Sequence, residues 1–170
     1  MTITRSHIDS PLGPIALGLT ERGLCALDFI GSDPPAAVHR RAVSPPEHWI
    51  AGRLLDYFDG ELDALDQIPV DPAGTAFQLR VWAELRRIPV GQARAYQEVA
   101  AAIGAPTAAR AVGAANGRNP ISLVVPCHRV IAADRSLHGY GGGLWRKDWL
   151  LRHEGFLPRE LFASPVVASR

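Results

Sequence analysis

Cysteine is scarce in this chain: Cys25 and Cys127 are the only two among 170 residues. They stand far apart in the sequence, which excludes a disulfide-rich scaffold and a CxxC metal knuckle. The first-half histidines His7, His39 and His48 show no metal-ligand spacing either, so we expect no metal site. In a reducing compartment both thiols are free, and the question is whether either one reacts.

Long apolar runs are also missing, and no segment reaches membrane-spanning length. Residues 1–12 lack the basic-then-apolar order of a secretory signal. With 47% hydrophobic residues the chain can still bury a core, and its length suits one compact domain or two small packed ones. We therefore expect a cytoplasmic protein without membrane association.

Lysine is rarer still, because 17 of the 18 basic residues are arginine and Lys147 is the exception. The net charge of +1 conceals a strong asymmetry along the chain. Residues 1–74 carry 5 basic and 11 acidic side chains, whereas residues 75–155 carry 11 basic and 5 acidic ones. This distribution indicates that the second half meets an anionic partner.

The first half has the pattern of a small antiparallel sheet followed by a helix. Turn-forming residues separate β-rich runs, which predict strands at 3–9, 14–20 and 24–30. Residues 31–46 are rich in Pro, Ala and Arg and predict a loop. A helix is expected at 47–59, with apolar spacing formed by Trp49, Ile50, Leu54, Leu55 and Phe58. The proline-containing run 66–74 predicts a linker, which gives domains at 1–74 and 75–170.

The second half has a mostly helical pattern, so the fold class is α+β. Thr75 can cap a helix that runs to about Ile88, whose buried stripe would be Phe77, Val81, Trp82 and Leu85. Two further helices at 96–103 and 108–116, the second capped by Thr107, flank a turn and form a helix-turn-helix. A final helix is expected at 144–153, and the tail after 156 shows no clear pattern. Trp82, Trp145 and Trp149 are expected in the core.

Cys127 lies in the run Pro126-Cys127-His128-Arg129-Val130, where it could be an inert core thiol. Three features favour a reactive one. Pro126 interrupts the apolar run, which argues against a central strand. His128 and Arg129 follow directly and can supply positive potential that favours the thiolate. Glu154 offers an acid for a Cys–His–acid arrangement, a known way to activate a nucleophile.

The run 126–130, together with the motifs around it, resembles the O6-alkylguanine-DNA alkyltransferase family. The resemblance extends from Phe77 to Gly155 and is looser before residue 75, where it is carried by Asp9-Ser10-Pro11-Leu12-Gly13. The matching motifs, in chain order, are Val81-Trp82, Ile88-Pro89-Val90-Gly91, Tyr96, 108–113, Asn119-Pro120, 126–130, 139–143 and 150–155. Their number and order make a chance match very hard to sustain.

The resemblance implies a fold and a reaction. The fold is a ribonuclease-H-like antiparallel sheet with a helix, followed by a helical domain that holds the helix-turn-helix and the active cysteine. The reaction is direct repair: an alkyl group moves irreversibly from O6 of guanine, or less often O4 of thymine, in duplex DNA to Cys127. Each molecule acts once as a suicide methyltransferase, and no cofactor is needed.

The resemblance also implies catalytic roles. Cys127 is the nucleophile, His128 takes its proton through a water, and Glu154 orients His128. Tyr96 donates a proton or hydrogen bond to the leaving guanine, with its hydroxyl supported by Lys147. Asn119 braces the turn that presents Cys127.

For DNA, the resemblance implies that the second helix of the helix-turn-helix enters the minor groove and that Arg110 fills the gap left by a flipped base. The remaining contacts would be Gln97, Ala105, Thr107, Arg118 and Ala133 for the DNA, and Tyr140, Val130, Gly141 and Lys147 for the base pocket. Many family members carry Ser in place of Gly141, which leaves the accepted alkyl groups open. The partner is duplex DNA with an alkylated guanine, bound by a monomer; cooperative binding of neighbours on DNA stays open.

Other functions remain as alternatives. An alkyltransferase-like binding protein would flip the base without reacting, but it lacks the nucleophile. A helix-turn-helix regulator would read bases with several polar side chains, and this second helix offers mostly Ala and Gly. A cysteine hydrolase would turn over more than once. We expect Cys25 to be a structural strand residue and assign His153 no catalytic role.

Overall fold

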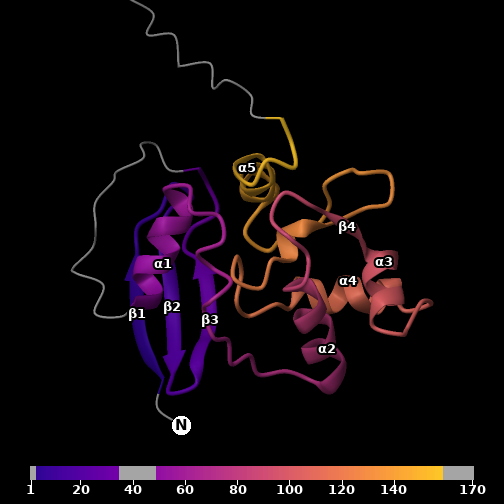
Figure 1. Ribbon diagram of the computed structural model, residues 1–170, viewed down its shortest axis with the longest axis horizontal. Helices are drawn as coiled ribbons and strands as arrows, with labels where there is room; N and C mark the ends of the chain where they lie inside the picture. Colours follow the sequence, from indigo (N-terminus) through magenta and orange to yellow (C-terminus); the bar gives the residue numbers. More distant parts are fainter. Residues whose placement is uncertain (1–2, 35–48, 159–170) are drawn as a thin grey trace, which may run out of the picture.

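The computed structural model describes residues 3–34 and 49–158. Its first part is an antiparallel sheet in the order β1-β2-β3, formed by β1 (Thr4–Ile8), β2 (Ile15–Thr20) and β3 (Gly23–Phe29). Alternate β2 residues point into the core, because Ile15, Leu17 and Leu19 are all at most 5% exposed. The three strands expected from the sequence are confirmed, and Figure 1 shows them on one side of the molecule.

Helix α1 (Trp49–Phe58) buries Ile50, Ala51, Leu54 and Tyr57 in the same core as the sheet. The expected apolar face was wrong at Trp49, which is 52% exposed. The reason is the helical repeat: positions 50, 54 and 57 form one stripe, and position 49 falls beside it. Residues 47 and 48 of the expected helix, and 35–46 of the expected loop, lie outside the described residues.

The segment expected as a linker is partly tied to the sheet. Leu24 N donates to Pro69 O at 2.9 Å, and Asp71 N donates to Leu24 O at 2.8 Å. Val70 therefore forms a parallel β-bridge with Leu24, at the start of β3. Position 23 passes directly against this segment, which gives the glycine there a specific structural role.

Gly23→Ala is expected to destabilise the fold by about 2–4 kcal/mol. Gly23 has φ of +145°, and an added Cβ would lie 2.4 Å from Pro69 O, a backbone atom that cannot move aside easily. The matched control is Gly52→Ala within α1, where an added Cβ meets nothing within 4 Å and should stabilise by roughly 0.5–1 kcal/mol. Urea unfolding measures both changes. Equal midpoints for the two variants would contradict the prediction.

The second part is helical and begins with α2 (Ala76–Leu85). Thr75 forms a capping box with Gln78, as expected for its helix start. The helix ends three residues earlier than predicted, since Arg86 to Ile88 form turns before Pro89. Trp82 is buried and its Nε1 donates to Ala115 O at 2.9 Å, which fixes α2 on α4.

The helix-turn-helix consists of α3 (Tyr96–Ala102) and α4 (Ala109–Gly117), which pack against each other and α2 (Figure 1). The expected cap at Thr107 is wrong, because α4 has Ala108 as its N-cap residue and no side-chain cap. The turn extends one residue further than predicted: Ala108 N still bonds the turn residue Ala105 at 2.9 Å. Thr107 therefore lies in the turn and is exposed.

Two short strands, one before the helix-turn-helix and one after the cysteine segment, pair in parallel. Arg94 of β4 (Arg94–Ala95) pairs with Val130 of β5 (Val130–Ile131). Tyr96 follows β4 directly, and the 3-10 turn Cys127–Arg129 directly precedes β5. The parallel register sets Arg94 beside Val130 and Ala95 beside Ile131, so the start of α3 is held beside the chain that follows the Cys127–Arg129 turn.

The final helix α5 (Leu144–His153) matches the expected range and lies between the two parts in Figure 1. Trp145 and Trp149 are only partly buried, contrary to the expected core positions. Trp145 Nε1 donates to Ser32 O at 2.9 Å, and Trp149 stacks on His153 with centroids 4.7 Å apart. Both rings therefore pack at the edge of the hydrophobic core and not inside it. Among the described residues, no helix is long and apolar enough to cross a membrane.

Candidate active site

Cys127 is presented by a tight turn held by Asn119. Asn119 Nδ2 donates to Val125 O at 2.7 Å, and its Oδ1 accepts from Ile121 N at 3.0 Å. Within this turn Leu123 has φ of +74°, a left-handed conformation that costs energy for a branched side chain. The bracing predicted for Asn119 is therefore compatible with its contacts, and the turn holds local strain next to Cys127.

Cys127 is 5% exposed, and burial raises the pKa of its thiol. Asn119 and the positive charge of Lys147 act in the opposite direction. The sequence suggested that the His128 and Arg129 side chains favour the thiolate; in the structure the contribution of His128 comes from a backbone hydrogen bond. The charge of Arg129 is engaged by Glu154, and burial keeps His128 neutral. The thiol therefore needs a base to remove its proton.

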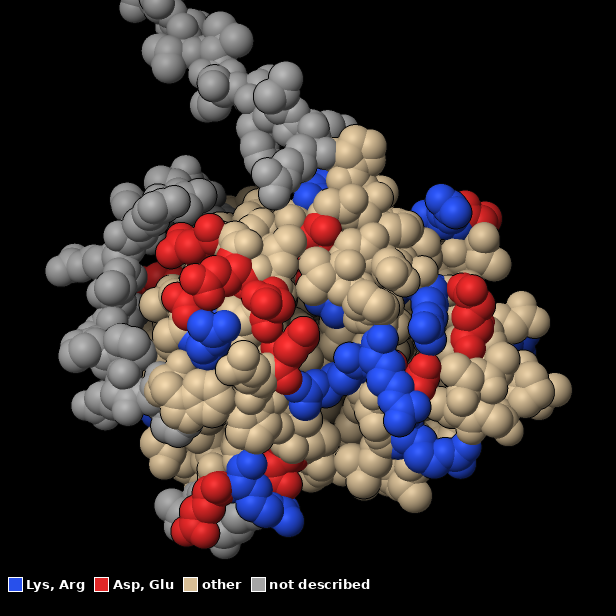
Figure 2. All heavy atoms as spheres, in the orientation of Figure 1, with Lys and Arg blue, Asp and Glu red and all other residues tan. Residues whose placement is uncertain are grey.

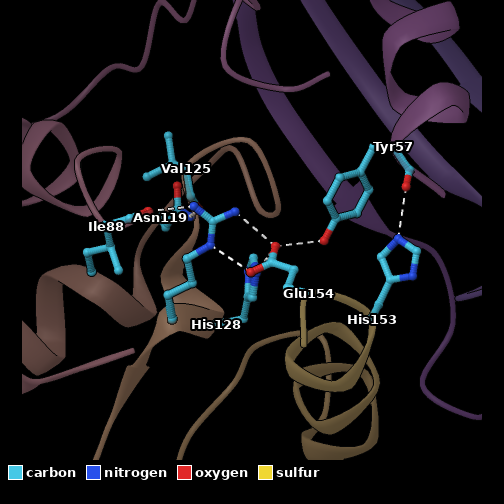
Figure 3. A network of polar contacts seen from close by, with 8 residues as sticks. Tyr57, Ile88, Asn119, Val125, His128, His153 and Glu154 are labelled. Carbon is cyan, nitrogen blue, oxygen red and sulfur yellow. Dashed lines mark hydrogen bonds and ion pairs between the residues drawn. The ribbon is translucent and has the colours of Figure 1, made fainter. Parts of the chain in front are cut away.

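Glu154, the C-cap residue of α5, is the centre of a buried polar network (Figure 3). Its Oε1 accepts from His128 Nε2 at 2.9 Å, from Arg129 Nη2 at 2.9 Å and from the Tyr57 hydroxyl at 2.8 Å. Its Oε2 accepts from Arg129 Nε at 2.8 Å. Arg129 Nη1 also donates to Ile88 O at 2.6 Å. The carboxylate thus has four donors, which suits a buried anion.

The charge states of His128 and Glu154 follow from these contacts. Burial by itself would raise the pKa of Glu154, but His128 and Arg129 outweigh it and hold the pKa far below its usual range. Burial lowers the pKa of His128, although Glu154 acts against this. A neutral imidazole that donates through Nε2 has Nδ1 as an acceptor. Within the described residues, this Nδ1 has no hydrogen-bond partner.

Tyr96 and Lys147 lie close enough to Cys127 for their charges to interact with it. Burial, with a contribution from Cys127, raises the pKa of Tyr96, so its hydroxyl stays protonated. Burial lowers the pKa of Lys147 to about 8. Lys147 Nζ donates to Val130 O at 2.7 Å and His138 O at 3.0 Å. These carbonyls take the place of the Tyr96 hydroxyl as its partners.

Tyr140 is the central residue of the expected base pocket. Its hydroxyl is buried without a hydrogen-bond partner among the described residues, and burial holds its pKa well above the usual value. Gly142 allows the Tyr140 ring and Phe29 to approach the backbone, since an added Cβ would lie 2.9 and 3.0 Å from them. Gly141 is exposed, and an added Cβ there meets nothing within 4 Å.

The expected DNA-binding residues lie mostly at the surface. Arg110 is exposed on α4, and so are Gln97, Thr107, Arg118 and Ala133, while Ala105 is half-buried. Figure 2 shows acidic side chains gathered on the side that holds the sheet, and Lys and Arg side chains in a broken line toward the helical part. The asymmetry of the sequence is therefore also an asymmetry of this face.

Two site residues were missed by the sequence interpretation. Asn116, which received no role in the sequence interpretation, is 4% exposed, and its Nδ2 donates to Cys127 O at 3.4 Å. Its spacing from Val112 on α4 was the available signal, because i and i+4 share a helix face. Tyr57 is fully buried, and a buried hydroxyl requires a partner; here that partner comes from the other end of the chain.

A metal centre finds no support in the described part of the chain, where no three His, Cys, Asp or Glu side chains gather. His39 and His48 lie outside that part. Cys25 is half-buried on β3. His153 Nε2 donates to the Tyr57 carbonyl at 2.8 Å, which is a structural contact.

Comparison with known proteins gives consistent results for both parts. Residues 76–156 match the family described as 6-O-methylguanine DNA methyltransferase, DNA binding domain, and residues 3–72 match the ribonuclease-like domain of the same name. The chain is 44% identical over 156 residues to the methylated-DNA–protein-cysteine methyltransferase of Methanosarcina barkeri, covering 86% of this chain and 94% of that protein.

A protein of the same name from Salmonella typhimurium is 56% identical over 108 residues. That alignment covers 64% of this chain and 63% of the Salmonella protein. A crystal structure of Mycobacterium tuberculosis OGT in complex with DNA superimposes with a TM-score of 0.69 and 41% identity, covering 88% of this chain and 91% of that one.

Proposed function

The chain belongs to the 6-O-methylguanine DNA methyltransferase family, and from this premise we propose that it repairs alkylated DNA by moving an alkyl group from guanine O6 to Cys127. The observation that carries the proposal is the Cys127-His128-Arg129 turn with His128 held against Glu154 at 2.9 Å. A nucleophile, a neutral base and an orienting carboxylate are the parts that activation of a thiol requires. The names of the relatives and the DNA-bound neighbour support the same activity.

The chemistry we propose balances as a simple displacement. The Cys127 thiol loses its proton through a bridging water to His128 Nδ1, and the sulfur forms a bond with the alkyl carbon as the bond from that carbon to O6 breaks. Glu154 stabilises the imidazolium that results. The guanine anion gains a proton from Tyr96, whose raised pKa keeps it protonated beforehand. The product thioether is stable, so each molecule acts once and needs no cofactor.

DNA handling is proposed in the same terms. The reacting carbon is inside a duplex, so the base has to leave the stack. The exposed Arg110 would occupy the gap while α4, whose surface is mainly small residues, approaches the minor groove. Tyr140 would close on the flipped base, with the Val130 carbonyl and Gly141 amide as partners. We propose duplex DNA with alkylated guanine as the substrate, one molecule per lesion, in the cytoplasm.

Intact-mass measurement after mixing with a duplex that contains O6-methylguanine tests the activity. Transfer adds about 14 Da, one CH2 equivalent, to the protein and stops at one equivalent per chain. Tight binding without a mass change would instead support the alkyltransferase-like alternative. Repair of more than one base per chain would support a hydrolase, and a footprint tied to one undamaged sequence would support a regulator.

Arg110→Ala is expected to slow repair of duplex DNA by roughly 10- to 100-fold, since base extrusion costs a few kcal/mol and the variant cannot fill the vacated stack. Reaction with the free base O6-methylguanine should be unchanged, because no duplex has to open. Arg5→Ala is the matched control, because Arg5 is an exposed arginine on β1 that has no expected DNA contact. Equal slowing of Arg110→Ala on duplex and free base would refute the role.

A further inference from the structure

Tyr57 connects the N-terminal sheet-and-helix part to the reacting end of the molecule. It is on α1, fully buried, and its hydroxyl donates to Glu154 Oε1 at 2.8 Å. Figure 3 shows its ring reaching from α1 toward Glu154 at the end of α5. The oxygen it contacts is the same one that accepts from His128 Nε2 at 2.9 Å. A side chain 70 positions before Cys127 therefore lies one contact away from the proposed base.

Backbone and ring contacts fix Tyr57 in this position. Its carbonyl accepts from His153 Nε2 at 2.8 Å, and its ring packs edge-on against His153 with centroids 5.1 Å apart. The neighbouring Phe58 ring lies 6.1 Å from that of Trp149. These contacts clamp the C-terminal end of α5, where Glu154 is the cap residue. The arrangement sets the position of the carboxylate in addition to its hydrogen bonding.

From this geometry we infer that Tyr57 is a positioning residue for alkyl transfer, acting on His128 through Glu154. The N-terminal part thereby contributes directly to the reaction and not only to the stability of the fold. The inference rests on the function proposed above, in which His128 receives the Cys127 proton. Tyr57 itself touches neither Cys127 nor the alkyl group in this scheme.

The sign of the effect follows from the sharing of one carboxylate oxygen. Burial, with the adjoining Glu154, holds the pKa of Tyr57 well above its usual value, so the hydroxyl remains a donor. With that donor removed, the charge of Glu154 Oε1 is shared by fewer groups and attracts His128 more strongly. The pKa of His128 should then rise. The other charges that act on this pair, Arg129 and Lys147, keep their places.

Tyr57→Phe removes the hydroxyl and keeps the ring. In single-turnover kinetics with duplex O6-methylguanine, we expect the maximal transfer rate to fall about fivefold, the order of one lost hydrogen bond. The half-saturating DNA concentration should be unchanged, because Tyr57 is buried away from the proposed DNA surface. The acid limb of the rate–pH profile should move to higher pH. NMR titration of the His128 ring nitrogens should show a raised pKa as well.

Ala51→Gly is the matched control for loss of stability alone, since Ala51 is buried on the same helix and holds no part of the network. It should lower the melting temperature without moving the acid limb. A wild-type rate and acid limb in folded Tyr57→Phe would overturn the inference. Failure of the wild type to gain mass would instead overturn the proposed function, and the NMR titration of His128 would still show whether Tyr57 tunes it.

Discussion

Cys127→Ser is expected to bind alkylated duplex DNA and to gain no mass from it. The hydroxyl of serine is a far weaker acid and nucleophile than a thiol, and the pKa of Cys127 is already raised by burial. A neutral imidazole that can remove the proton of a buried thiol is too weak a base to deprotonate a serine hydroxyl, which is far less acidic. Since the two side chains differ little in size, the variant should keep the fold, which thermal unfolding checks.

Cys25→Ser is the natural control, because it changes the only other cysteine of the chain. Cys25 lies half-buried on β3 and makes none of the hydrogen bonds described around Glu154. This variant should still gain one alkyl equivalent per molecule in the mass measurement. Transfer by Cys127→Ser, or loss of transfer in a folded Cys25→Ser, would contradict the assignment of Cys127 as the acceptor.

Elements with strong local signals were predictable from the sequence. Turn residues separate the three strands, and Thr75 is followed by Gln78 at the spacing of a capping box. Thr107 failed as a cap because threonine alone does not fix where a turn ends, and the backbone bond of Ala108 to Ala105 moved the helix start. Trp49 failed because hydrophobicity alone does not fix a helix face when an aromatic residue borders the buried stripe.

For the site, the motif around Cys127 indicated the nucleophile, the base and the acid, but not the electrostatics. Arg129 looked like a source of positive potential because it is two residues from Cys127. In the fold its guanidinium points to Glu154 in a bidentate pair, so the sequence neighbour is not the electrostatic neighbour. Lys147, 20 positions away, is the cation that acts on the thiol. Tyr57 could not be found from sequence, since nothing local links α1 to residue 154.

Glu154→Gln is expected to destabilise the protein by about 3–5 kcal/mol at pH 7, and to reduce transfer severely. The change removes the anion that pairs with Arg129, whose side chain is only 6% exposed, and leaves a buried guanidinium uncompensated. The amide also brings two N–H donors to a position surrounded by donors. Asp148→Asn on the same helix is the matched control, because its pair with Arg152 is partly exposed and should be worth less than about 1 kcal/mol.

The pH dependence of the same variant provides a second, independent check. The pKa of Glu154 is depressed in the fold, so its stabilisation is fully present above the unfolded value of about 4.3 and is lost as the pH falls below it. His128, whose pKa is lowered mainly by burial, is neutral in both states above about 6.5 and destabilises the fold as the pH falls below that value.

Glutamine cannot titrate, so the stability gap between wild type and Glu154→Gln should narrow by roughly 1.4 kcal/mol per pH unit below about pH 4. Urea midpoints at pH 7, 5 and 3.5 measure it. A gap that stays constant over this range would mean that Glu154 is not the anion that holds Arg129 and His128 in place, and the proposed activation of Cys127 would lose its orienting group.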